Sequence, residues 1–133
     1  MAAQHNPLMS AKPELTVQVV VQPLPEETRP ERGVWAYRYT ITIVNTGKVT
    51  AQVLGRHWRI FDARGRMQSV DGLAVVGHQP LLTPGQQFQY SSWAQIETPQ
   101  GSMRGKLLCA TDTAEIFYVE VEEFALSDTS ALH

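Results

Sequence analysis

Cysteine and charge are both scarce in this chain. Its 133 residues include one cysteine, Cys109, so no disulfide can form within the chain and the fold does not depend on an oxidising compartment. Charged residues make up 18% of the sequence and the net charge is −2. A domain that binds nucleic acid is expected to be basic, so we expect no nucleic-acid partner.

Long apolar runs are also missing. No run approaches the roughly 20 residues that cross a bilayer, so we expect no membrane insertion. The first residues lack a basic segment followed by an apolar one, which indicates no signal peptide and a cytoplasmic protein. With 43% hydrophobic residues, the chain is long enough for one domain with its own core. We predict a flexible arm over residues 1–14, one domain over 15–127 and a flexible tail over 128–133.

Apolar and polar residues alternate along most of the chain. The odd positions from Trp35 to Ile43 are all aromatic or aliphatic, and three of the even positions between them are arginine or threonine. This period of two predicts a strand with one buried face. Other runs of this kind cover residues 17–21, 54–60, 88–90, 103–109 and 116–124.

Turn signals separate these runs. Glycine ends short polar segments at residues 45–47, 62–65 and 83–85, and residues 23–33 hold three prolines, which predicts a surface loop. No segment shows a helical period over more than one turn. We therefore predict an all-β fold, an antiparallel β-sandwich of six to eight strands.

Trp58 is predicted to be a core residue rather than a platform for stacking a ligand. It shares its parity with Leu54 and Ile60, so the three side chains are expected on one inner face. Arg59 and Phe61 have the opposite parity and are expected on the more solvated side.

Residues 72–77 read Gly-Leu-Ala-Val-Val-Gly, which is nearly a Gly-x-Gly-x-x-Gly loop with Ala74 in place of the middle glycine. In a dinucleotide-binding fold such a loop opens a helix whose amides hold the pyrophosphate. Here His78, Gln79 and a proline follow, and no amphipathic helix begins. We therefore predict that residues 71–80 form an exposed, irregular loop rather than a strand-to-helix turn.

Catalytic and metal-binding patterns are weak. The four histidines have no neighbours at metal-ligand spacing, although convergence in space remains open. There is no Gly-x-Ser-x-Gly segment and no defensible pair of carboxylates, and Cys109 falls on an apolar run. We predict no catalytic residues, no resident metal and no cofactor.

Charges of each sign gather in separate parts of the chain. Residues 29–66 are rich in arginine, and residues 112–128 contain six acidic residues and no basic one. One interpretation is solvation with pairing between neighbouring strands. The other is a basic face for an acidic or phosphorylated partner.

Several separate segments, in order, resemble one family. They are Asn-Thr-Gly at 45–47, Arg-His-Trp-Arg-Ile at 56–60, Val-Val-Gly-His-Gln-Pro at 75–80, Thr-Pro-Gln-Gly-Ser-Met-Arg-Gly at 98–105 and Phe-Ala-Leu at 124–126. The chain is similar over residues 15–127 to the ApaG family, whose members share an Arg-His-Trp strand, a Val-Val-Gly-x-Gln-Pro loop and a Thr-Pro-x-Gly-x-Met-x-Gly segment.

This resemblance implies an immunoglobulin- or fibronectin-III-like sandwich with no established enzymatic activity. It also implies a genetic link to cobalt tolerance and magnesium efflux. Related domains in eukaryotic F-box proteins and in a DNA-polymerase-delta-interacting protein imply binding to another protein. Many members have a complete Gly-x-Gly-x-x-Gly loop, from which this chain departs at Ala74.

Three functions follow as hypotheses. The first is a non-enzymatic module that binds a protein partner, whose identity the sequence leaves open, as it does the oligomeric state. The second is a small-ligand site for a nucleotide or pyrophosphate, and the third is direct binding of a divalent metal. The residues predicted for the small-ligand site are Gly72, Ala74, Gly77, His78, Gln79, Arg56 and Arg104.

Overall fold

The computed structural model describes residues 12–128, and the predicted arm and tail therefore lie mostly outside the described residues. Within that range the chain forms eight strands and two short 3-10 turns. In chain order they are β1 (Leu15–Pro23), η2 (Pro25–Glu27), η3 (Pro30–Arg32), β2 (Trp35–Asn45), β3 (Ala51–Asp62), β4 (Met67–Leu73), β5 (Leu81–Leu82), β6 (Gln87–Ile96), β7 (Gly101–Thr111) and β8 (Ile116–Leu126).

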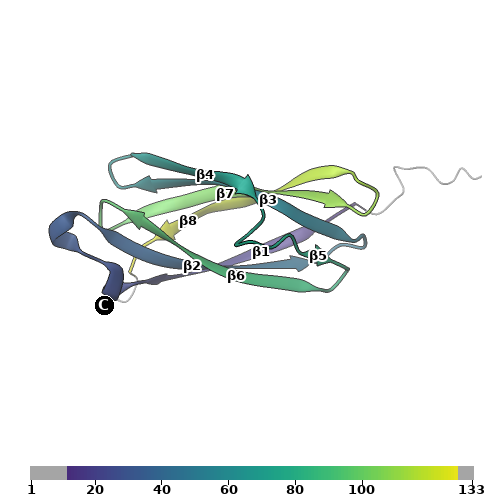
Figure 1. The fold of residues 1–133 in the computed structure, drawn as a ribbon, viewed down its shortest axis with the longest axis horizontal. Helices are drawn as coiled ribbons and strands as arrows, with labels where there is room; N and C mark the ends of the chain where they lie inside the picture. The colour runs from purple at the N-terminus through teal and green to yellow at the C-terminus, as the bar shows by residue number, and fades with distance from the viewer. Residues whose placement is uncertain (1–11, 129–133) are drawn as a thin grey trace, which may run out of the picture.

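The strands form two antiparallel sheets packed as a sandwich (Figure 1). The smaller sheet has the order β1-β2-β6, and the larger has the order β4-β3-β7-β8 with β5 added beside β3. The predicted all-β sandwich is confirmed. No helix within residues 12–128 is long and apolar enough to cross a membrane.

Strand β2 shows the predicted alternation. Tyr37, Tyr39 and the two isoleucines that follow at odd positions are buried, whereas Arg38 is exposed. Ala36 departs from the pattern, with 1% of its surface exposed. Its amide donates to the hydroxyl of Thr28, and its carbonyl accepts from the amide of Leu24, so the turn after β1 covers it.

A β-bulge in β3 changes which side chains face the core. Val53 pairs with Cys109, but two residues later Gly55 pairs with the preceding residue of β7, so Leu54 is an extra residue. The buried positions change from odd numbers to even numbers across this bulge, and Trp58 lies on the inner face. The prediction that Leu54 shares that face was wrong, because the extra residue shifts the register and leaves Leu54 half-buried and outside the core cluster.

Trp58 is the largest fully buried side chain, which confirms its predicted place in the core. Its ring meets the edges of Tyr39 and Phe124, with centroids 5.9 and 6.2 Å away. Opposite it on β7 lies Gly105, where an added Cβ would be 2.6 Å from the indole and 2.0 Å from the carbonyl oxygen of His57. Because Gly105 has no side chain, the indole of Trp58 can occupy this space.

We expect Trp58→Ala to lose about 3–5 kcal/mol of unfolding free energy, because it empties a large buried site. Thermal melts should show a clear fall in the midpoint. The matched control is Trp93→Ala, since Trp93 is 55% exposed and its removal opens no cavity. An equal midpoint for the two variants would contradict the core assignment.

Candidate functional site

Residues 71–80 are partly strand and partly loop. Residues 71–73 complete β4 and pair with β3, and no helix begins near Val76. The prediction of an irregular loop was therefore wrong for residues 71–73. It was also wrong for Val75, which is fully buried. Val75 and His78 exchange backbone hydrogen bonds of 2.7 and 3.0 Å, and this tight turn directs the valine into the core.

The amides of this loop hold it against β3. Ala74 donates its amide to the carbonyl of Leu54 at 2.6 Å, and the side-chain amide of Gln79 donates to the same carbonyl at 3.0 Å. Ala74 and Gly77 have left-handed backbones, with φ of 70° and 80°. In this part of the chain the donors of Ala74 and Gln79 therefore serve the fold, and a phosphate site here stays a prediction.

The side chain of Arg56 accounts for the glycine at position 72. It pairs with Leu107, which is fully buried, and so lies on the inner side of β3. Across from it on β4, a Cβ added to Gly72 would lie 2.6 Å from Nη1 of Arg56. The guanidinium also donates to the carbonyl of Leu73 at 3.2 Å. Burial raises the pKa of Tyr90, and the positive charge of Arg56 acts against that shift. Gly72 thus makes room for a guanidinium.

The other predicted site residues are spread over different surfaces. His78 lies against Phe88, with ring centroids 5.5 Å apart. Arg104 pairs with Arg59 on the outer face of the larger sheet, and its guanidinium carbon is 5.0 Å from the ring centroid of Phe61. The structure therefore brings Arg56 beside the loop and places Arg104 elsewhere.

Metal ligands do not gather in this structure. Within residues 12–128 no group of three or more histidine, cysteine or acidic side chains could hold an ion. His57 is 2.9 Å from a carboxylate oxygen of Asp71, and Arg59 donates to the same oxygen at 2.8 Å. Both hydrogen bonds lower the pKa of Asp71, and the bond from Arg59 has the larger effect. Burial raises the pKa of the Cys109 thiol to about 12.

The outer face of the smaller sheet is almost without charge. Its cross-strand neighbours are joined through polar side chains, for example Thr40 with Ser91 at 2.8 Å. Arg38 is its one charged residue among the described strands. The outward residues are Thr16, Gln18, Val20 and Gln22 on β1, Arg38, Thr40, Thr42 and Val44 on β2, and Gln87, Gln89, Ser91, Trp93 and Gln95 on β6.

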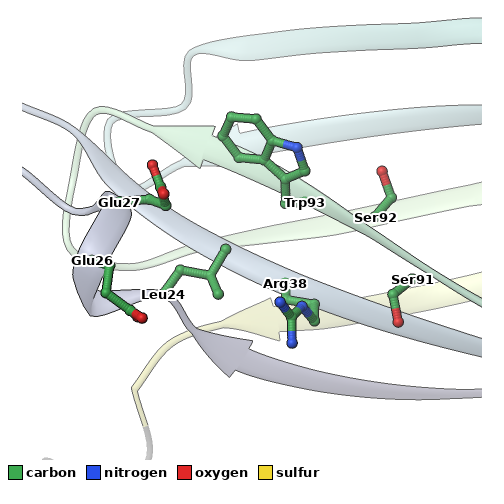
Figure 2. A pocket seen from close by; sticks show the side chains of 7 residues that line it. All are labelled: Leu24, Glu26, Glu27, Arg38, Ser91, Ser92 and Trp93. Atoms are coloured by element: carbon green, nitrogen blue, oxygen red, sulfur yellow. The ribbon is translucent and has the colours of Figure 1, made fainter.

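A groove of about 640 Å³ lies on this face beside the turn that follows β1. Trp93 and Arg38, which pair across β6 and β2, form its floor, and the turn η2 forms one wall (Figure 2). We call it the Trp93 groove. The residues that line it are Leu24, Glu26, Glu27, Arg38, Ser91, Ser92 and Trp93.

Trp93 is not among the site residues predicted above, although the sequence carries a signal for its position. Along β6 the even positions face the core, as Tyr90, Ala94 and Ile96 show by their burial. Trp93 has the opposite parity, so an extended run of alternation would have placed it on the outer face. Its 55% exposure is high for a tryptophan.

The chain is similar to known proteins over most of its length. A family model described as the ApaG domain matches residues 25–111. The chain belongs to the ApaG family. Protein ApaG of Ralstonia nicotianae is 51% identical over 120 residues, which cover 90% of this chain and 97% of that protein. Protein ApaG of Acidovorax sp. is 50% identical over 117 residues, covering 86% of this chain and 85% of that protein.

A solved structure agrees with this assignment. The crystal structure of a Bordetella pertussis protein described as ApaA has a TM-score of 0.85 at 43% identity, and the match covers 87% of this chain and 94% of that one. Two of the segments that resembled the ApaG family meet in the core, since Trp58 lies against Gly105. The hydroxyl of Tyr37 on β2 donates a hydrogen bond to the carbonyl of Pro99, which belongs to the segment 98–105.

We expect Ala74→Gly to stabilise the protein by about 0.5–1 kcal/mol. A left-handed backbone costs alanine about 1–2 kcal/mol, and glycine removes this strain. The greater conformational freedom of glycine in the unfolded chain offsets part of that stabilisation. Chemical denaturation measures the difference. Ala110→Gly within β7 is the control, and it should destabilise by about 0.5–1 kcal/mol. A loss of stability in Ala74→Gly would contradict the described loop conformation.

Proposed function

We propose that the protein is a non-enzymatic module that binds a protein partner through the outer face of the smaller sheet. The observation that carries this proposal is the exposed indole of Trp93 on a face where the described strands β1, β2 and β6 hold a single charged residue. Interfaces between proteins are enriched in aromatic residues and depleted of most charged ones near their centres. Tryptophan is also among the residues that most often dominate binding energy.

The contrast with the other sheet strengthens this proposal. The outer face of the larger sheet has His57, Arg59, Arg104 and Lys106 on two adjacent strands, as a solvated sheet usually does. The smaller sheet has threonine, serine and glutamine in the same setting, and these side chains hydrogen-bond to one another. Such a face loses little solvation when another protein covers it, because few charges must be desolvated.

The Trp93 groove offers both an apolar contact and charges at its border. Leu24 and Glu27 line this groove together with Trp93, and Figure 2 shows Leu24 nearer to Arg38 and Glu27 nearer to the indole. Within residues 12–128 neither Glu27 nor Arg38 forms an ion pair. A partner that inserts an apolar side chain between Leu24 and Trp93 could therefore also pair with these charges. That pairing would set its orientation more than its affinity.

The chemistry of the remaining side chains favours binding over catalysis. The thiol of Cys109 is fully buried and its pKa is raised, so it is a poor nucleophile. His57 is held by Asp71, and His78 lies against Phe88. We propose that the link to cobalt tolerance and magnesium efflux that the family resemblance implies acts through the protein partner.

We expect no micromolar binding of a dinucleotide, pyrophosphate, Co²⁺ or Mg²⁺ by the purified protein. Donors of the glycine-containing loop are used by the fold, and residues 12–128 hold no cluster of metal ligands. Isothermal titration calorimetry with each compound measures this. Micromolar binding that Arg56→Ala abolishes would favour the small-ligand hypothesis, and binding of a cation alone would favour the metal hypothesis.

We expect Trp93→Ala to weaken binding to the physiological partner by at least about tenfold while leaving the thermal midpoint unchanged. Affinity capture of the tagged protein, followed by quantitative mass spectrometry, compares the parent and the variant. The matched control is Leu81→Ala, because Leu81 is 58% exposed and lies on β5, away from the Trp93 groove. Equal recovery of every captured protein by the parent and Trp93→Ala would refute the proposal.

A further inference from the structure

The outer face of the larger sheet exposes apolar side chains at one end. Ile116 and Tyr118 at the start of β8 are 58% and 51% exposed. Their cross-strand partners on β7 are Ala110 and Leu108, which are half-buried and face the same side. We call these four residues the apolar end. They form a continuous patch across two neighbouring strands, and more than half of the surface of Ile116 and of Tyr118 stays exposed.

Further along the same strands, basic side chains stand directly opposite one another. His57 pairs with Lys106, and Arg59 pairs with Arg104. Arg59 and Arg104 are like charges in directly opposite positions, which destabilise a sheet unless something else compensates them. Asp71 offsets only one end of this group, through its contacts with His57 and Arg59. We call His57, Arg59, Arg104 and Lys106 the basic row.

Beside the basic row, β8 exposes a row of glutamates that is poorly paired. Glu120 stands opposite Lys106, but the ammonium of Lys106 lies 4.5 Å from the ring centroid of Tyr118 instead of pairing with that carboxylate. Glu123 approaches Arg104 only to 3.9 Å. Glu120 and Glu122 form no ion pair within residues 12–128. We call Glu120, Glu122 and Glu123 the acidic row.

A hollow of about 360 Å³ separates the two rows and is lined by members of both. Two positions of β8 stand opposite Arg104, because the register between β7 and β8 shifts there. This shift places Glu122 and Glu123 together and widens the acidic row. The face therefore has three parts in a fixed order: an apolar end, then a basic and an acidic row side by side.

We propose that this face binds a second copy of the chain in a symmetric dimer. A two-fold axis parallel to the strands, running between β7 and β8, would bring two such faces together. Rotation about that axis exchanges the two sides of the face and keeps its two ends in place. The β7 members of each basic row, Arg104 and Lys106, then lie over the acidic row of the other copy, and the two apolar ends meet. Such a self-complementary contact is what a two-fold interface requires.

Other occupants use only part of this surface. An anionic partner would gain from the basic row and be repelled by the acidic row, and a cationic partner would meet the reverse. A second copy satisfies both rows and also covers Ile116 and Tyr118. The proposal does not depend on the Trp93 groove, which lies on the opposite sheet and remains open in this arrangement.

Sedimentation velocity over a concentration series, at low salt and in about 1 M NaCl, tests the dimer. We expect concentration-dependent dimerisation that weakens at high salt, where the screening length falls to about 3 Å. A monomer at all concentrations in low salt would overturn the proposal. Dimerisation that does not respond to salt would overturn the pairing of the rows.

Exchange of charges gives the sharper test. One variant combines Arg104→Glu with Lys106→Glu, which places acidic side chains on β7 as well as on β8. A second combines Glu120→Lys with Glu122→Lys, which places basic side chains on β8 as well as on β7. Each variant alone should be monomeric, and an equimolar mixture should form a heterodimer, because opposite rows again face each other. Circular dichroism confirms that both variants are folded. A folded mixture that stays monomeric, or a folded variant that still dimerises alone, would refute the proposal.

The apolar end is tested independently of the charges. Ile116→Asp should weaken dimerisation by at least tenfold. The control is Val20→Asp on the smaller sheet, since Val20 and Ile116 are both 58% exposed. If Val20→Asp weakens the dimer and Ile116→Asp does not, the interface lies on the other sheet and the proposal is wrong.

Discussion

The extra residue at Leu54 is the constraint on which the larger sheet depends. Strand β3 pairs with β4, β5 and β7, so its register determines which way the side chains of its neighbours face. After the bulge, Trp58 enters the core while His57 and Arg59 turn outwards. Without the bulge the parity would reverse, and a tryptophan would lie in solvent while a histidine and an arginine entered the sandwich. Few other single positions in the chain could have so large an effect.

The two sheets combine one shared core with two outer surfaces of different chemistry. The inner faces are mainly apolar and aromatic, and Trp58 contacts both Tyr39 of the smaller sheet and Phe124 of the larger. The outer faces are under no common packing constraint, so one could become nearly uncharged and the other strongly charged. Stability and recognition therefore depend on different residues of the same strands, which separates the two properties in mutational experiments.

The sequence predicted what depends on local pattern and missed what depends on register. Alternation along β2 located its buried face, and the burial of Trp58 followed from its apolar neighbours. The bulge at Leu54 arises from pairing with β7, which no local pattern reveals. For the same reason the sequence could not separate Arg56, on the inner side beside Gly72, from Arg104 on the outer face. The outward position of Trp93 could have been predicted, because it has the opposite parity to the apolar residues of β6 that face the core.

The lone cysteine of this sandwich is a natural reporter of its opening. Cys109 lies in the middle of β7 with none of its surface exposed, and burial raises the pKa of its thiol to about 12. A thiol reagent reacts with the thiolate, so it can reach this residue only when the two sheets separate or β7 detaches. The rate of labelling under native conditions then gives the frequency of these openings, a property that melting curves do not resolve. No engineered probe is needed to follow the breathing of the core.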